Sequence, residues 1–332
     1  MLVRKVAFIG TGGTISSLGA SPLDIVHYGL QKKMIAAGDI LAAIPEVQEV
    51  AQVEAVPFAT VPSPNIGFAE WKALSALCSR LEAEQPDLAG IVIGHGTATL
   101  EETAYALSLI LKTSLPVVVV GSQRPLSGLA SDAKMNLVNA VRVAADPRSR
   151  DRGVLVVLND EIHAAREVTK TATYRLQTFR APDFGMLGYV DGEAVSYYRR
   201  GERTTYPHTE FEIASVEQLP RVDIAYAYSG ADGADVDAYV MAGAAGIVAA
   251  GFAPGMTTEA QLEALKRAAA AGVTIVQATR AGSGVVHDSP RLVELGFVPA
   301  DNLNPQKARI LLALTLTRSR ERGEIMRSFA RY

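Results

Sequence analysis

The sequence predicts an α/β protein of two domains, a larger N-terminal one and a smaller C-terminal one. Three observations support this prediction. Short apolar runs with the character of β-strands alternate along the chain with segments of helical spacing. The chain has 332 residues, enough for two domains with well-buried cores. Hydrophobic residues make up 48% of it and aromatic ones only 6%, the Ala-, Val- and Gly-rich bias usual for α/β proteins.

The first apolar run, within VRKVAFIGTGGTIS (residues 3–16), predicts a buried strand that ends at Gly10. Further glycines at 12 and 13 turn the chain and let backbone N–H groups come close to a small molecule. Ile15 stands where a dinucleotide-binding fingerprint has its third glycine, and no P-loop lysine follows. The stretch is therefore either an ordinary tight turn or a place where the Thr14 hydroxyl is held beyond a strand.

The rest of the N-terminal part continues the alternation. Pro and Asn residues at 62–65 close the second strand, and glutamates at 101 and 102 suit the positive end of a helix dipole. The expected elements are helices over 30–44, 68–84, 100–112 and 132–145, and strands over 53–61, 90–94, 116–121 and 154–158. Strands that alternate with helices imply a parallel sheet with right-handed crossovers, of the flavodoxin or Rossmann type.

A charged segment with two prolines and no sustained period predicts an interdomain linker over 200–220. The predicted domains are therefore 1–199 and 221–332. In the second domain we expect strands over 222–228, 246–250 and 273–277, and helices over 257–271, 304–315 and 321–332.

Composition excludes several classes of protein. A formal net charge of −3 offers no electrostatic footprint for nucleic acid. The single cysteine, Cys78, rules out an internal disulfide and a two-cysteine racemase mechanism. The most apolar run, 240–253, is too short to span a bilayer, and no signal peptide precedes the first strand. These two observations predict a cytoplasmic protein. The five histidines lack metal-ligand spacing, so no metal is expected, and the predicted chemistry needs no organic cofactor.

Hydroxyl side chains follow three of the predicted strands. Thr14, Ser63 and Thr97 each lie just past a strand's carboxyl end. Ligands of parallel α/β sheets bind beyond these ends. Convergence of three hydroxyls at one edge of the sheet therefore predicts a functional cleft.

The chain resembles the bacterial-type L-asparaginases and glutaminase-asparaginases along essentially its whole length. The matching segments are TGGTIS (11–16), GHGTATLEET (94–103), SDAKMNL (131–137), VLNDEIHAAREVTKT (157–171) and LNPQKAR (303–309). The resemblance implies two α/β domains and a homotetramer built as a dimer of dimers. Each active site would lie between the large domain of one subunit and the small domain of its neighbour.

The resemblance also implies roles for individual residues. Thr14 falls on the threonine nucleophile and Tyr28 on the tyrosine of the mobile lid. Thr97 and Lys170 fall on the second polar group, and Ser63 on the serine that holds the substrate carboxylate. A threonine hydroxyl needs a neighbour that takes its proton. The oxyanion needs fixed donors, which the turns around Gly13 and Gly96 can supply.

Four positions depart from the family pattern. Ala98 stands where the family has an aspartate that completes a Thr-Lys-Asp triad and binds the substrate's α-ammonium. Pro64 replaces a glutamine beside the substrate, Pro254 an asparagine, and Ser289 the glutamate that reaches across the interface. An ammonium buried without a carboxylate partner costs several kcal/mol.

The predicted function is hydrolysis of a carboxamide or related C–N bond (amide, imide or lactam) of a small acid through an acyl-threonine intermediate. The departures favour a substrate without a free α-amino group. The alternatives are an L-asparaginase inactivated by an introduced Ala98, and a pseudoenzyme that binds a small metabolite. Because position 98 lacks a carboxylate, the pKa of Lys170 is expected to be low, unless Glu101, Glu102 or Glu167 takes the missing role.

Overall fold

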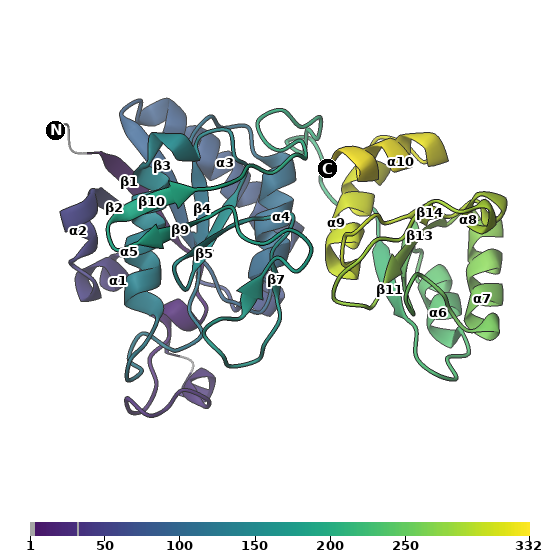
Figure 1. Ribbon diagram of the computed structural model, residues 1–332, viewed down its shortest axis with the longest axis horizontal. Coiled ribbons are helices and arrows are strands. Elements are labelled where there is room, and N and C mark those ends of the chain that lie inside the picture. The colour runs from purple at the N-terminus through teal and green to yellow at the C-terminus, as the bar shows by residue number, and fades with distance from the viewer. Residues whose placement is uncertain (1–3, 32) are drawn as a thin grey trace. The chain divides into compact units, whose positions relative to one another are not determined.

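The computed structural model describes residues 4–31 and 33–332. The parts of the predicted first strand and of the predicted helix over 30–44 that fall on residues 3 and 32 lie outside the described residues. The chain forms two compact units, one up to Thr209 and one over Glu210–Tyr332, whose helices and strands are labelled in Figure 1.

An eight-stranded sheet forms the centre of the N-terminal unit, with the order β10-β9-β6-β5-β4-β3-β1-β2. Strands β1 to β5 pair with one another in parallel. Strands β6, β9 and β10 add antiparallel pairs at one edge of the sheet. The strands are β1 (Lys5–Gly10), β2 (Gln52–Val56), β3 (Leu88–Gly94), β4 (Val117–Val120), β5 (Leu155–Leu158), β6 (Glu161–Ala164), β9 (Gly188–Asp191) and β10 (Ala194–Tyr197). A separate pair consists of β7 (Thr169–Lys170) and β8 (Phe179–Arg180).

Helices cover this sheet because its central strands are apolar on both sides, as parallel strands usually are. The helices are α1 (Ala37–Ala43), α2 (Val47–Val50), α3 (Phe68–Glu84), α4 (Leu100–Ile110) and α5 (Ala133–Ala145). Val92 of β3 packs into one buried cluster with residues of α1, α2 and α5. Its neighbours Ile91 and Ile93 are fully buried and point to the opposite face.

Two predicted elements are shorter than expected. The helix predicted over 30–44 is present only as α1. Its first part instead pairs with the turn that carries Thr14, since Ile35 N donates to Ser16 O and Leu18 N to Lys33 O. The strand predicted over 53–61 ends at Val56, after which the chain crosses to the loop that follows β1, where Val61 N donates to Thr11 O. Tertiary pairing overrides local propensity in both places.

The C-terminal unit has a four-stranded parallel sheet with the order β11-β12-β13-β14. Its strands are β11 (Val222–Tyr226), β12 (Gly246–Gly251), β13 (Thr274–Thr279) and β14 (Val298–Pro299). Its helices are α6 (Ala234–Met241), α7 (Glu259–Ala270), α8 (Pro290–Leu295), α9 (Pro305–Leu316) and α10 (Arg322–Arg331). The α/β fold class with a smaller second sheet is confirmed, whereas α6, α8 and β14 were not expected from the sequence.

Residues just after the predicted end of the first domain are bonded to the N-terminal unit. The Tyr206 side chain donates to Leu115 O, and Thr209 Oγ1 donates to Leu109 O, at 3.0 and 2.6 Å. The domain limits of 199 and 221 stay a prediction. Among the described residues, no helix is long and apolar enough to cross a membrane.

Candidate active site

The larger sheet changes the direction in which strands are added at β1. From β1 the chain adds β2 on one side and then returns to add β3 on the other. Loops that leave neighbouring strands in opposite directions open a ligand crevice at the carboxyl edge of a sheet. Thr14 follows β1 in the short 3₁₀-helix Thr14–Ser16, and Thr97 follows β3 in the loop before α4. The edge predicted from the sequence therefore lies at the topological switch point.

Three loops meet at this edge through close backbone contacts. A Cβ atom on Gly13 would lie 2.1 Å from the Cα of Gly96, and one on Gly96 would lie 2.6 Å from Oγ of Ser63. Gly13 also has φ 86° and ψ −168°, a conformation essentially limited to glycine. These two glycines are therefore needed for Thr14, Ser63 and Thr97 to approach one another.

The predicted nucleophile is hydrogen-bonded to the predicted lid tyrosine. Thr14 Oγ1 lies 2.8 Å from the Tyr28 hydroxyl oxygen. Thr14 is buried, and Tyr28 is half-buried at the start of the 3₁₀-helix Tyr28–Gln31. Proton exchange between these two hydroxyls is geometrically possible.

Lys170 and Thr97 form the second polar pair. Lys170 Nζ donates to Thr97 Oγ1 at 2.8 Å, from β7 to the loop after β3. Partial burial lowers the pKa of Lys170, whereas the negative charge of Glu101 acts in the opposite direction and raises it. The lowering of the Lys170 pKa that the sequence predicts is therefore confirmed. It holds although the carboxylate of Glu101 is close enough to act on the Lys170 ammonium.

Glu101 acts on the site, although the sequence favoured a helix-dipole role for it and gave pairing with Lys170 as an alternative. It lies in the first turn of α4 with its side chain buried. Glu167, the alternative partner, instead forms an ion pair with Arg199. Among the candidate substitutes for the missing aspartate, Glu101 has a charge that acts on Lys170.

The remaining predicted binding residues lie in the segments that follow β2 and β3. Ser63 is buried, and Thr99 Oγ1 donates to its carbonyl oxygen at 2.6 Å. Pro64 and Ala98 are exposed beside Ser63 and Thr97 respectively. Thr99 is a positioning residue that sequence reasoning missed, although it lies in the same segment as Thr97.

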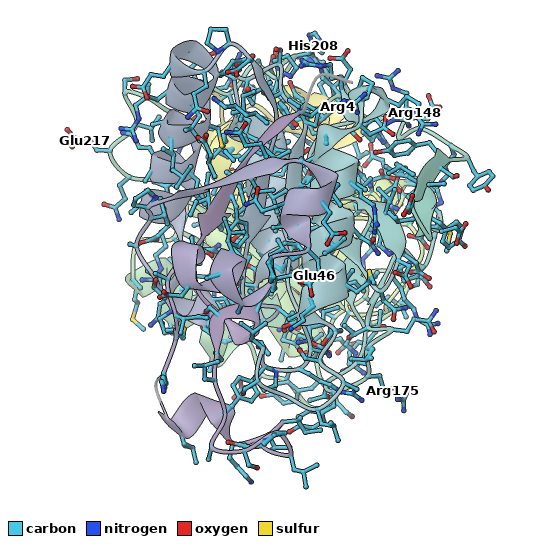
Figure 2. All side chains as sticks on the ribbon, turned by 90° about the vertical axis from the view of Figure 1, so that its left-hand side faces the viewer. Arg4, Glu46, Arg148, Arg175, His208 and Glu217 are labelled. Atoms are coloured by element: carbon cyan, nitrogen blue, oxygen red, sulfur yellow. The ribbon has the colours of Figure 1, made fainter. Side chains whose placement is uncertain are left out.

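Two other groups of charged or titratable residues are structural. His95 is fully buried, its Nδ1 lies 2.8 Å from Gly96 O, and burial lowers its pKa to about 4, so the ring is neutral at pH 7. Arg148 is exposed and forms an ion pair with Asp146. Figure 2 shows Arg148 and Arg175 at the periphery of the view. The basic loop around Arg148 is therefore a solvated surface.

Restoring a carboxylate at position 98 tests the titration of Lys170. Ala98→Asp is expected to raise the pKa of Lys170, because a nearby negative charge favours the ammonium form. If the neutral amine is the active form, the rise of kcat with pH moves to higher pH. The measurement is the pH–rate profile of both proteins, with uncharged Ala98→Asn as the matched control. An unchanged profile in Ala98→Asp would show that Lys170 does not titrate during turnover.

Comparison with known proteins matches both units to one family. Residues 5–203 match the family described as "Asparaginase, N-terminal", and residues 221–329 match "Glutaminase/Asparaginase C-terminal domain". The chain belongs to the asparaginase family. It is accordingly an amidohydrolase of that family, acting on amide C–N bonds.

Full-length relatives support this membership. The "probable L-asparaginase periplasmic" of Haemophilus influenzae is 37% identical over 331 residues, which cover 98% of this chain and 92% of the relative. The "Glutaminase-asparaginase" of Pseudomonas fluorescens biotype A is 36% identical over 333 residues, with 99% and 91% covered. The crystal structure of a "probable cytoplasmic L-asparaginase" from Campylobacter jejuni has a TM-score of 0.94 at 35% identity, with 99% and 100% covered.

Proposed function

We propose that this asparaginase-family protein hydrolyses a carboxamide or related C–N bond of a small acid that lacks a free α-amino group. The observation that carries the proposal is Ala98, which is exposed next to the Lys170–Thr97 pair. In the family, this position holds the carboxylate that binds the substrate's ammonium. Glu101, the carboxylate whose charge reaches Lys170, is itself buried. A substrate ammonium would then add a second positive charge beside Lys170, without a new partner.

The proposed reaction runs through an ester of Thr14. Thr14 Oγ1 attacks the amide carbonyl carbon and gives its proton to the Tyr28 hydroxyl oxygen, 2.8 Å away, as the Tyr28 hydroxyl releases its own proton to the Lys170–Thr97 pair. Backbone N–H groups of the turns at Gly13 and Gly96 stabilise the oxyanion. The C–N bond then breaks as the Lys170–Thr97 pair hands this proton on to the leaving nitrogen, so that the pair returns to its starting state. Water hydrolyses the acyl-threonine and restores the Thr14 hydroxyl.

A second candidate is hydrolysis of L-asparagine or L-glutamine themselves. The names of the relatives favour it, since they are L-asparaginases and glutaminase-asparaginases. The negative charge of Glu101 near Lys170 also supports this second candidate, because that charge replaces part of the charge of the missing aspartate. Binding of a metabolite without turnover, the third possibility from the sequence, predicts no ammonia release from any amide.

The test compares succinamate, which is L-asparagine without its α-amino group, with L-asparagine itself. The kcat/KM for succinamate is expected to be larger by at least about a hundredfold, because an unpaired ammonium in a partly desolvated site costs several kcal/mol. Ammonia release measures both reactions. The variant Ala98→Asp should bring the ratio of kcat/KM for succinamate to kcat/KM for L-asparagine closer to one. Equal kcat/KM values in the unaltered protein would contradict the proposal and favour the second candidate.

We also infer that the protein acts as a homotetramer in the cytoplasm. The tetramer is the assembly that the family resemblance implies, and in it a neighbouring subunit's small domain would complete each active site. One relative is named a "probable cytoplasmic" and another a "probable … periplasmic" L-asparaginase, so location is tested by cell fractionation. Light scattering of the purified protein measures the mass of the assembly.

A further inference from the structure

A cavity of about 240 Å³ lies within the C-terminal unit. It is formed by the segments Pro254–Thr257 and Val285–Phe297, with Gln277 of β13 also lining it. Ligands of parallel sheets bind at the carboxyl ends of the strands, and this cavity lies beyond the ends of β12 and β13. It therefore occupies the usual place for a ligand in this second sheet.

The lining of the cavity is mostly apolar. Its apolar side chains include Met256, Leu262, Val285, Val286, Leu292, Leu295 and Phe297. The side-chain nitrogen of the buried Gln277 already donates to Ala249 O and Ala278 O, at 2.9 and 3.1 Å. An apolar cavity of about 150 Å³ can hold a benzene molecule, so this one has room for a group of phenyl size.

Among the described residues, the lining of the cavity contains no carboxylate that could pair with an ammonium ion. Ser289 Oγ accepts a hydrogen bond from Leu292 N and thereby caps α8. Arg291 also lines the cavity and is exposed. Its positive charge disfavours a second cation nearby. In the part of the chain that the structure describes, the cavity thus combines a mostly apolar lining with one cationic side chain and no carboxylate. Its other polar side chains are Thr257, Gln277, His287 and Ser289.

Two residues connect this cavity with the substrate. Pro254 and Ser289 fall on the positions where the family's small domain contacts the substrate's α-ammonium, and both line the cavity. Where the family presents an amide and a carboxylate, this chain presents a proline and a serine.

We propose that the cavity receives an apolar group, of about six to eight carbon atoms, that the substrate carries in place of asparagine's ammonium. This inference rests on the proposed function, in which a neighbouring subunit's small domain completes the active site. The substrate class is then an ω-amide of a small dicarboxylic acid with an apolar substituent on the carbon next to its free carboxylate.

The experiment uses succinamates that carry hydrogen, methyl, propyl or benzyl at that carbon. In the unaltered protein, kcat/KM is expected to rise along the series, and to be about tenfold to a hundredfold higher for benzyl than for hydrogen. The reason is that a phenyl group buried in the cavity loses its contact with water. This series needs no variant, so it tests the proposal even if a substitution disturbs folding.

Val285 and Val293 offer a matched pair of substitutions. Val285 lines the cavity and is 38% exposed, whereas Val293 lies on α8 outside the lining and is 54% exposed. Val285→Trp is expected to fill the opening and lower the benzyl-to-hydrogen ratio of kcat/KM by about tenfold or more. Val293→Trp should leave that ratio unchanged. Thermal unfolding of both variants verifies that each protein is folded.

The outcomes separate this inference from the proposed function. If succinamate is preferred over L-asparagine but the benzyl compound gains nothing, the cavity proposal is wrong and the proposed function stands. If Val285→Trp and Val293→Trp change the ratio equally, the benzyl group binds elsewhere and the cavity proposal is again wrong. Should L-asparagine be the better substrate throughout, the proposed function itself fails.

Discussion

Replacing Thr14 by alanine is expected to lower kcat by about 10⁴-fold or more, the scale seen when a nucleophile is removed from an enzyme. The proposed acyl intermediate forms on Thr14 Oγ1, and alanine has no atom that can replace it. The substitution removes one hydrogen bond, to the Tyr28 hydroxyl, from a buried position. Ammonia release under substrate saturation measures the loss, and unfolding by heat should show a stable protein.

Two variants make this result specific to the nucleophile. Thr14→Ser keeps the hydroxyl and is expected to retain part of the activity. Tyr28→Phe keeps the Thr14 hydroxyl but removes the group 2.8 Å away that would take its proton, so an intermediate loss is expected. Substantial activity in Thr14→Ala would instead assign the nucleophile to Thr97.

The convergence of hydroxyls could be predicted from the sequence because strand ends are easy to recognise. Thr14 and Thr97 each follow an apolar run that the structure confirms as β1 or β3, and parallel pairing brings those ends together. Neighbouring strand ends meet whatever the loop sequences are. The Lys170–Thr97 hydrogen bond could be predicted only from the family resemblance, because 73 residues separate its partners in the sequence.

The buried role of Glu101 shows where sequence reasoning stops. Glu101 and Glu102 are adjacent in the first turn of α4, and both suit the helix dipole equally well. Only packing determines which of the two points inward, and Glu101 is buried whereas Glu102 is partly exposed. The antiparallel edge strands were missed for a related reason. They are four residues long, and β9 and β10 are only partly buried, so their apolar pattern is weak.

The cavity in the C-terminal unit could not be predicted either. Some of its apolar side chains, those of Met256 and Leu262, precede β13 in the sequence. The others belong to the segment 285–297, which follows β13. Neither segment has a recognisable motif for binding. Pro254 and Ser289 were noticed only as departures from a pattern, and the structure adds that they share one cavity.

Gly13→Ala is expected to destabilise the protein by about 3 kcal/mol or more. About 1–3 kcal/mol comes from forcing alanine into the backbone conformation that Gly13 adopts, with φ 86° and ψ −168°. The rest comes from a Cβ atom placed 2.1 Å from the Cα of Gly96, a backbone atom that can move only with its loop. In the protein that still folds, separation of the two loops should lower kcat/KM by about a hundredfold, because misplacement of reacting groups by about 1 Å has that effect.

Gly38→Ala is the matched control for this change. Gly38 lies within α1, and a Cβ atom there meets nothing within 4 Å, so alanine is expected to stabilise the helix by about 0.5–1 kcal/mol. Urea unfolding gives the free energy of unfolding of both variants, and ammonia release gives their kcat/KM. If Gly13→Ala were as stable and as active as Gly38→Ala, the contact between the loops after β1 and β3 would not be needed to hold Thr14 beside Thr97. The catalytic arrangement proposed for this edge of the sheet would then be wrong.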